Sequence, residues 1–593
     1  MTANWDLSYL YKGYNDSKID EDLDQASKIA DELEDYHGKL KRGEMTANEL
    51  LHLFQQAEKV DTLLSKAGAY GALLFFQETT NENHKALYAR MDQRSVEINN
   101  KLLWITLELN ALQQEKIDEY LSDPLLANYH HYITVKRLQQ PYLLSEEVEQ
   151  VLSQKSLVGK LAWLKFYQEY TAAFEFEVEI EGKMKKMSPG EIYPLIRDPN
   201  PQTRENVYTT YYQKYADESI AISHCFNNIW KNHGQDVDLR NYPTTMTPAH
   251  IRNQTDEKIV QTMMEIIKKN YSFVQDYYKA KAKLMGQGSK IKGSDLYAPL
   301  GTSIKYTWEE AKDLVLDAYI GFDSEIGEMA KLFFDRKLID SEVRKTKRSG
   351  AFCMGIAPGI DPVLHMSFDG TPDGVSTLAH EMGHGLHDMF SGRKQTIFNF
   401  NPPLVAAETA SVFGEQILID KMLKTLPDEE AKLKLLANQL EDAIATISRQ
   451  TMYVFFEREC HEKGAKENLS SKQMSEIWNK HVKDAYGEAV DFLPEQSWNW
   501  SSIPHFLDPR VFYCYSYSFG MLFVLGLYQK YLEEGESFIP KYKQILEAGG
   551  SQFPVDMAAS VGLDITQPEF WQAGFDYLRK LLKEFQNIVD SKA

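Results

Sequence analysis

The strongest constraint on the fold is a helical period that runs through most of the chain. Apolar residues recur three and four positions apart in segments such as residues 50–78, LLHLFQQAEKVDTLLSKAGAYGALLFFQE. Similar patterns cover, in outline, residues 16–120, 145–173, 201–285, 308–334 and 375–593. The sequence therefore predicts a large, mainly α-helical fold.

The helical period breaks in two places. Residues 174–180 alternate apolar and acidic side chains, and Glu181-Gly182 offers a turn before residues 183–187, which predicts a small hairpin. The run Ser188-Pro189-Gly190 then marks a domain boundary near residue 190. Residues 350–374 are irregular and strand-like, so we expect a small sheet that leads directly into the next helix.

The composition of the 593-residue chain excludes several classes of protein. Its net charge of -21 leaves no excess of Lys and Arg to neutralise phosphates, which argues against nucleic-acid or anionic-membrane partners. Its first residues lack the basic and apolar regions of a secretory signal, and no run of apolar residues is long enough to span a membrane. Four cysteines are too sparse for a disulfide scaffold, so we expect free thiols and a cytoplasmic location.

The segment VSTLAHEMGHGLHDMF, residues 375–390, carries the pattern H-E-x-x-H. His380 and His384 are four residues apart, so on a helix they lie on one face and can bind one Zn²⁺. Glu381 follows the first histidine and is placed to take a proton from the attacking water and pass it to the leaving amine. An apolar stripe at helical spacing supports the helix, and Thr371-Pro372 suits its beginning.

A catalytic zinc needs a third protein ligand. The metzincin pattern would need Gly at 387 and His at 390, but these positions are His387 and Phe390, so that class is excluded. We expect His387 to be a surface residue or one that supports a ligand. The alternative is Glu408, predicted in the first turns of the next helix among small residues. Glu415 is seven residues further on the same face and is a candidate hydrogen-bond acceptor for a ligating histidine.

A second aromatic segment, PHFLDPRVFYCYSYSFG at residues 504–520, offers His505 and three alternating tyrosines. Tyr513, Tyr515 and Tyr517 would share one side of an irregular or extended segment. They could donate hydrogen bonds to an oxyanion, although such a run is also typical of core packing.

Several motifs together resemble the M3 metallopeptidases, in particular the oligoendopeptidase F branch. They are FDGTPDGVSTLAHEMGHGLHD, AAETASVFGE and PHF…FYCYSYSFG, joined by WDLSYLY, YLLSEEVEQVL and DLYAPL. The similarity covers nearly the whole chain. It implies a mainly α, neurolysin-like fold with a small sheet beside the active-site helix and a deep substrate channel. It also implies an N-terminal helical domain at residues 1–190 and a catalytic domain at 191–593, with the zinc-binding helix at 375–390.

The resemblance implies one Zn²⁺ per chain and an endopeptidase that cleaves short unstructured oligopeptides. Carried over to this sequence, the resemblance assigns the metal ligands to His380, His384 and Glu408 and the general base to Glu381. It makes Glu415 the acid that supports a ligand. The residues that contact substrate and the transition state are His505, Tyr515 and Tyr517. Tyr513 remains an alternative for the oxyanion. Residues 352–355 would pair with substrate backbone by strand addition. Ser376 stands where some members of the wider family carry an acid.

Two other functions stay open. A zinc carboxypeptidase on the same scaffold would need a cation for the peptide's terminal carboxylate, and Arg510 is a candidate. A peptide-binding protein with an inactive zinc site would not need Glu381.

Overall fold

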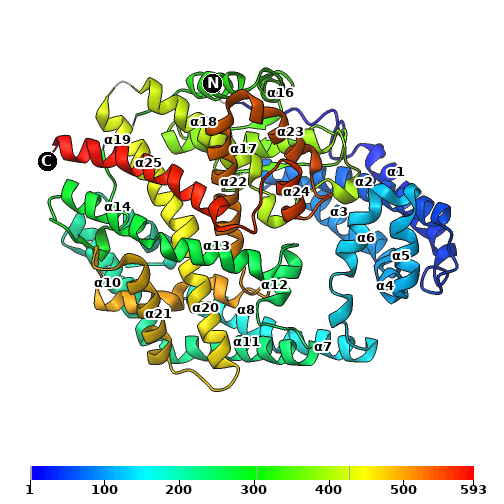
Figure 1. The fold of residues 1–593 in the computed structure, drawn as a ribbon, viewed down its shortest axis with the longest axis horizontal. Helices are drawn as coiled ribbons and strands as arrows, with labels where there is room; N and C mark the ends of the chain where they lie inside the picture. The colour runs from blue at the N-terminus through cyan, green and yellow to red at the C-terminus, as the bar shows by residue number, and fades with distance from the viewer. Residues whose placement is uncertain (1–2, 302–303, 427, 593) are drawn as a thin grey trace. The chain divides into compact units, whose positions relative to one another are not determined.

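The computed structural model describes residues 3–301, 304–426 and 428–592 (Figure 1). The chain divides into two compact units, each assembled from separate segments. Unit 1 comprises Met1–Pro141, Ser303–Thr425 and Leu527–Asp564. Unit 2 comprises Tyr142–Thr302, Leu426–Gly526 and Ile565–Ala593.

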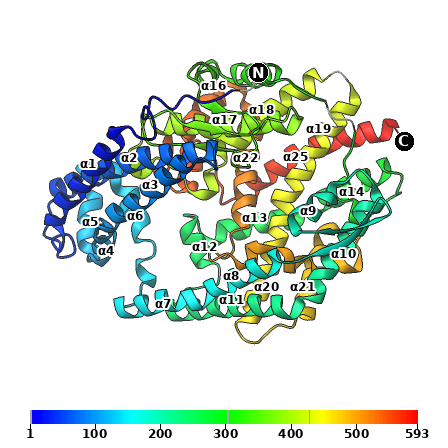
Figure 2. The same ribbon diagram turned by 180° about the vertical axis from the view of Figure 1, so that it is seen from behind.

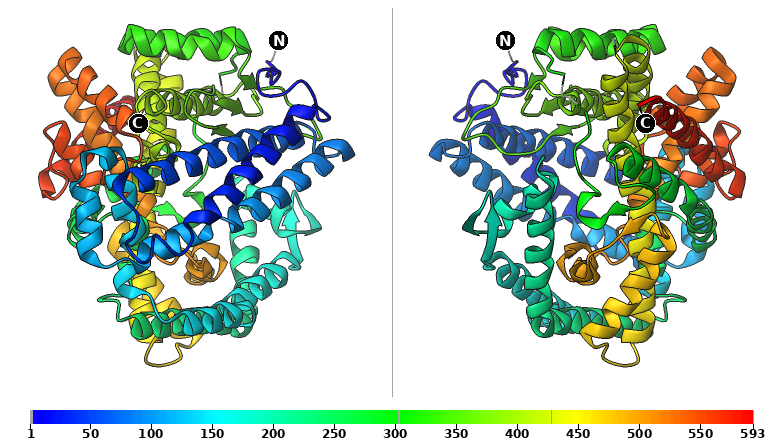
Figure 3. Two further views of the ribbon diagram at one scale, coloured as in Figure 1. Left: turned by 90° about the vertical axis from the view of Figure 1, so that its right-hand side faces the viewer. Right: turned by 90° about the vertical axis from the view of Figure 1, so that its left-hand side faces the viewer.

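The described part of unit 1 is mainly helical and contains three short strands. Its helices are α1 (Ser17–Leu33), α2 (Ala47–Gln77), α3 (Glu82–Asn100), α4 (Leu103–Ala111), α5 (Gln114–Ser122), α6 (His130–Arg137), α15 (Trp308–Phe322), α16 (Ser324–Asp335), α17 (Pro372–Ser391), α18 (Thr409–Thr425), α23 (Ile539–Ala548) and α24 (Pro554–Ser560). Its strands are β4 (Ile339–Asp340), β5 (Phe352–Met354) and β6 (Val363–His365). Helices α1, α2 and α3 pack side by side, as the blue ribbons of Figure 3 show.

Unit 2 is also mainly helical. Its helices are α7 (Glu146–Val158), α8 (Lys160–Ala172), α9 (Pro189–Ile192), α10 (Pro201–Asp217), α11 (Ser219–Arg240), α12 (Thr247–Arg252), α13 (Glu257–Lys269), α14 (Tyr271–Leu284), α19 (Glu429–Ala443), α20 (Gln450–Gly464), α21 (Ser471–Tyr486) and α25 (Pro568–Lys592). Its strands are β1 (Phe176–Ile180), β2 (Lys183–Met187), β3 (Ile291–Lys292) and β7 (Val490–Asp491). The division between the units falls within α22 (Tyr515–Glu534).

The hairpin predicted after residue 174 is present as β1 and β2. Phe176 pairs with Met187, and the side chains of β1 are alternately buried and exposed. Glu181 and Gly182 at the turn both have positive φ angles, 53° and 74°, which suits a tight two-residue hairpin. The alternating pattern in the sequence therefore correctly indicates a strand with one buried face.

Helix α17 lies at the centre of unit 1. It contacts α15, α16, α18 and α23 as well as β5 and β6, and Figure 2 shows it beside α16 and α18. The strands form a three-stranded sheet in the order β4-β6-β5, with β5 antiparallel to β6. Among the described residues β6 is the only strand paired with β5, so β5 is an edge strand. This is the small sheet that residues 350–374 predict.

The prediction of a mainly α fold with small sheets is confirmed. The helical ranges expected from the period correspond to real helices, although several are split by short turns. Within the described ranges, no helix combines the length and the apolar character needed to cross a bilayer.

Candidate metal centre

The sequence sets the beginning of α17 through its capping residues. The side chain of Thr371 accepts a hydrogen bond from the backbone N–H of Gly374 (3.1 Å), and Pro372 occupies the first turn. Asp369 in turn accepts hydrogen bonds from the backbone and hydroxyl of Thr371, at 2.9 and 2.6 Å. The helix therefore begins eight residues before His380 and carries both histidines in its interior.

Three side chains of unit 1 converge to form what we call the metal group: His380, His384 and Glu408. Glu408 Oε2 lies 3.4 Å from Nε2 of His380 and 3.4 Å from Nε2 of His384. Zinc bonds of about 2.0–2.1 Å in tetrahedral geometry place neighbouring ligand atoms about 3.3–3.4 Å apart. The two measured separations fit this value, so the donor set suits a zinc-sized cation.

Two glycines let the helices of the metal group approach closely. A Cβ on Gly383, inside the H-E-x-x-H motif, would collide with the backbone of Ala410. A Cβ on Gly414 would collide with the hydroxyl of Tyr319, which donates a 2.7 Å hydrogen bond to the carbonyl of Ala379. Close packing of α17 on α18 brings a short glutamate side chain within reach of the histidines. The sequence placed Glu408 among small residues, and Gly383 opposite Ala410 is what permits the close approach.

The prediction that Glu408 lies in the first turns of the helix is wrong, because Glu408 lies directly before α18. Helix α18 begins at Thr409, and the carbonyl of Glu408 accepts the N–H of Val412 (3.1 Å). Its carboxylate Oε2 accepts a 2.6 Å hydrogen bond from the Ser411 hydroxyl. The position at the helix N-terminus favours a negative charge and limits the rotation of the carboxylate.

Glu415 contacts the metal group through His380, since its Oε1 forms a short hydrogen bond with His380 Nδ1. Burial opposes the His380 cation, but this hydrogen bond and the charges of Glu415 and Glu408 outweigh it and raise the His380 pKa to about 9. Burial likewise opposes ionisation of Glu408, but the two histidines hold its pKa down at about 2. Hydrogen bonding at Nδ1 leaves Nε2 of His380 directed at Glu408.

Glu381 is 7% exposed and lines a pocket of about 410 Å³ in unit 1. The same pocket is lined by both histidines and by Phe352 and Cys353 of the edge strand β5. Burial raises the pKa of the Glu381 carboxyl above its usual range, and the charges of the two histidines oppose this shift. A carboxylate with a raised pKa beside the metal group is suited to accept a proton.

His387 and Asp388 also line this pocket. His387 is 3% exposed, so the expectation of a surface residue is wrong, and burial lowers its pKa to about 3. Burial raises the pKa of Asp388 to about 7, and its carboxylate packs so closely on Gly355 that a Cβ there would require the carboxylate to shift. No motif in the sequence marks Asp388, and its signal is its position four residues after His384, on the same helix face.

His505 and the tyrosines belong to unit 2. The prediction that the tyrosines share one side of an extended segment is wrong, because Tyr515 and Tyr517 lie in the first turn of α22. Residues two apart on a helix face nearly opposite sides. Tyr515 is fully buried with its hydroxyl 3.3 Å from Nδ1 of His250, and burial raises its pKa. Tyr517 is 37% exposed, and burial of its hydroxyl still raises its pKa to about 12.

Tyr513 joins Tyr517 and His505 in a cluster of three rings. The centroids of Tyr513 and Tyr517 are 5.2 Å apart, and those of His505 and Tyr517 are 6.0 Å apart. Arg510, the cation considered for a carboxypeptidase, donates to both carboxylate oxygens of Asp508, at 3.0 and 2.8 Å. Its charge is therefore already matched by a carboxylate.

Sequence comparison matches residues 195–312 and 322–577 to Peptidase family M3, and residues 108–176 to Oligopeptidase F. The chain belongs to peptidase family M3. It is a metallopeptidase of the oligoendopeptidase F type, and the family implies both a metal cofactor and peptide substrates. The resemblance found in the motifs is thereby confirmed.

Relatives of this M3 peptidase match it over nearly its full length. Oligopeptidase PepF of Bacillus subtilis is 25% identical, with 99% of this chain and 87% of that protein covered. An oligoendopeptidase F homolog of Borreliella burgdorferi is 24% identical, with 98% of each covered.

Solved structures share the fold. A putative peptidase from Chlamydophila abortus has a TM-score of 0.90 at 24% identity, covering 99% of this chain and 98% of that one. Oligoendopeptidase-F from Enterococcus faecium has a TM-score of 0.70 at 24% identity, covering 97% and 99%.

Proposed function

We propose that this M3 peptidase is a zinc-dependent endopeptidase that hydrolyses short, unstructured oligopeptides. The observation that carries the proposal is the pair of 3.4 Å separations between Glu408 and the two histidines, beside the buried carboxyl of Glu381. A zinc ion held by the metal group would act as a Lewis acid toward water and the scissile carbonyl.

Glu381 acts as the general base. It takes a proton from the attacking water as the water oxygen bonds to the carbonyl carbon, and it delivers a proton to the amine nitrogen when the C–N bond breaks. Its raised pKa brings proton uptake nearer to neutral pH than an exposed glutamate would allow. Glu415 fixes the ring of His380 through the hydrogen bond to Nδ1.

Strand β5 offers a place for the substrate backbone. It is an edge strand, its residues are half-buried, and Phe352 and Cys353 line the same pocket as Glu381. An extended peptide can add to such an edge through main-chain hydrogen bonds, which selects unstructured substrates rather than folded proteins.

His505 and Tyr517 are proposed to contact the substrate and to stabilise the oxyanion. The ring cluster supports Tyr513 as the second phenol, because Tyr515 is buried against His250 and is suited to position the start of α22.

The predicted domains, 1–190 and 191–593, are supported by matched segments that end at residue 176 and resume at 195. The cytoplasmic location and the deep substrate channel stay predictions.

The test uses an internally quenched oligopeptide with an amidated C-terminus, together with the metal content of the purified protein. The proposal expects about one zinc per chain and cleavage at an internal bond, located by mass spectrometry. Release of single C-terminal residues from a free peptide, without cleavage of the amidated one, would instead support the carboxypeptidase.

A further inference from the structure

Unit 2 contains a cavity of about 720 Å³, which we call the tyrosine cavity. This volume lies within the range of about 300–1,000 Å³ that is usual for ligand sites. Aromatic side chains make up much of its wall, including Tyr193, Tyr208, Tyr297, Tyr453, Tyr486 and Trp478. His505 also lines it, so a residue proposed to contact substrate faces the same space.

Arg449 lines the tyrosine cavity without a carboxylate partner. Its Nη1 donates to the hydroxyl of Tyr297, and its guanidinium lies 5.8 Å from the centroid of the Tyr297 ring. Its Nε is buried and has no hydrogen-bond partner, and no described carboxylate forms an ion pair with it. An arginine stays charged at all ordinary pH values, and an inward-facing charge without a counter-charge is unfavourable.

Two further polar atoms in the wall lack partners. The hydroxyl of Tyr208 is buried, as is Oε1 of Gln450, and neither forms a hydrogen bond among the described residues. Tyr208 is only 2% exposed, so bulk water does not satisfy its hydroxyl. A buried polar group without a partner calls for one, so three such groups in one cavity support a polar occupant.

The charges around the tyrosine cavity favour an anionic ligand. Lys483 lines it as well, whereas the carboxylate of Glu488 in its wall is 2.9 Å from Nζ of Lys290. The lining therefore presents Arg449 and Lys483 against one carboxylate that already has a cation. This excess of positive charge is local, since the whole chain carries a net charge of -21.

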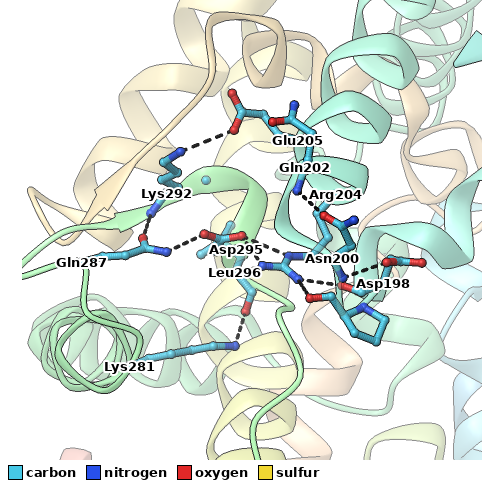
Figure 4. A network of polar contacts seen from close by, with 12 residues as sticks. Asp198, Asn200, Gln202, Arg204, Glu205, Lys281, Gln287, Lys292, Asp295 and Leu296 are labelled. Carbon is cyan, nitrogen blue, oxygen red and sulfur yellow. Dashed lines mark hydrogen bonds and ion pairs between the residues drawn. The ribbon is translucent and has the colours of Figure 1, made fainter. Parts of the chain in front are cut away.

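A network of polar contacts surrounds Asp295 and Leu296, directly before Tyr297 in the chain (Figure 4). Arg204 donates to Asp295 Oδ1 at 2.6 and 3.0 Å, Gln287 donates to Oδ2 at 2.5 Å, and Lys281 donates to the carbonyl of Leu296 at 2.9 Å. In this network the buried arginine has its own carboxylate. The contrast with Arg449 shows that the fold supplies counter-charges nearby but leaves Arg449 without one.

Arg449 ends a π-helical turn, Ile444–Arg449, between α19 and α20. Such turns are frequent at functional sites, and they shift a side chain out of the α-helical register. Here the turn places Arg449 in the wall together with Gln450, the first residue of α20.

We propose that the tyrosine cavity binds a carboxylate of a peptide, with Arg449 as the counter-charge and Tyr208 as a second donor. The planar guanidinium matches the two oxygens of a carboxylate, and the aromatic wall accommodates neighbouring side chains. The carboxylate is the C-terminal one of the oligopeptide or that of an Asp or Glu side chain. This inference deepens the proposed function and rests on it.

The test compares two pairs of labelled hexapeptides. One pair differs only in a C-terminal carboxylate or carboxamide, and the other contains an internal Asp or Asn. Dissociation constants are measured with the Glu381→Gln variant, which is expected to turn the peptides over at least about 10³-fold more slowly, and KM values with the wild-type enzyme. At least one carboxylate peptide is expected to bind roughly tenfold to a hundredfold more tightly than its neutral partner.

Substitutions then assign this preference to the cavity. In Arg449→Gln the ratio between charged and neutral peptides should fall to about one. In Arg458→Gln, an arginine of α20 that stacks on Phe455 outside the cavity lining, the ratio should be unchanged. Tyr208→Phe removes only an unpartnered hydroxyl, so it should fold normally and reduce the ratio by roughly threefold to tenfold.

Equal affinities within both peptide pairs would overturn the inference, as would a preference that survives both Arg449→Gln and Tyr208→Phe. The binding measurement does not depend on turnover. A wild-type protein that cleaves no peptide but prefers carboxylates would therefore count against the proposed function and not against the cavity.

Discussion

In the metal group of unit 1 each charged atom faces a group of opposite charge, whereas Arg449 in the tyrosine cavity of unit 2 faces none. Glu408 lies between two histidines and accepts a hydrogen bond from Ser411, and His380 is held by Glu415. In the cavity, Arg449, Tyr208 and Gln450 each retain an unpartnered atom.

The difference separates two ways of preparing a site. Paired groups hold one another in place, so the side chains of the metal group keep a ligand spacing suited to zinc through their own contacts. Unpaired groups are unfavourable until a ligand arrives, which makes that ligand's binding stronger and more selective for charge.

Among the paired groups of the metal group, removal of Glu408 is expected to have the largest effect. Glu408→Ala leaves two histidines as ligands, so bound metal and kcat/KM should fall together, the latter by at least about 10³-fold. Substitution of a residue that only supports a ligand costs less, about 10- to 100-fold. Metal content by mass spectrometry and peptide cleavage measure both effects. Glu328→Ala, an exposed glutamate of α16, is the matched control. If Glu408→Ala retained both metal and activity, Glu408 would not be a metal ligand and the proposed site would be wrong.

The two tyrosines of α22 test the proposed division of roles in unit 2. Tyr517→Phe removes a half-exposed donor and should lower kcat by about 10²- to 10³-fold, the range for loss of one oxyanion donor. Tyr515→Phe removes a hydroxyl that bonds within the core and should lower kcat by less than about tenfold, with a lower melting temperature. The reverse order of kcat values would return the catalytic role to Tyr515.

Glu415 sharpens the comparison because it touches the metal group only through His380. Glu415→Gln keeps a hydrogen-bond acceptor but removes the negative charge, so zinc affinity should fall about tenfold to a hundredfold. Competition with a chelator measures this affinity, and activity at saturating zinc should largely recover. An unchanged affinity would show that the short hydrogen bond to His380 has no effect on the metal.

Glu457 in unit 2 tests the cost of an unpaired buried charge through pH. It is fully buried, its Oε1 accepts the N–H of Phe512 (2.9 Å), and burial raises its pKa from about 4.5 to about 8. His461, 3.7 Å away, has its pKa lowered to about 3 by burial and stays neutral in this window.

Since the folded state favours the protonated form of Glu457, its contribution to stability is lost as pH rises from about 4.5 to about 8. Glu457→Gln lacks this titration, so its stability relative to wild type should increase across that window and level off above it. The expected change is on the order of a few kcal/mol, measured by urea unfolding at about pH 5, 7 and 9. A difference that is constant with pH would contradict the raised pKa.

The sequence predicts those parts of the fold and site that depend on spacing within one element. The H-E-x-x-H pattern and the alternation in the hairpin each follow from a helix or strand period. Periodicity identifies a helix but not the residue at which the helix begins, so it does not place Glu408 directly ahead of α18.

The tyrosine cavity could not be predicted in this way. Its wall draws on residues from Tyr193 to His505, brought together only by tertiary packing. The aromatic run around Tyr515 is compatible with a strand or with a helix, and the burial that separates Tyr515 from Tyr517 depends on His250 of a distant helix. The lack of a partner for Arg449 is likewise a property of three-dimensional surroundings.

The central claim is that Glu381 performs the proton transfer beside a metal held by other residues. The most direct test measures metal content and kcat for Glu381→Gln, with Glu328→Gln as the matched control. The account predicts wild-type metal content and a loss of at least about 10³-fold in kcat, since the amide cannot accept the proton. Near-normal turnover by a metal-loaded Glu381→Gln protein would contradict it.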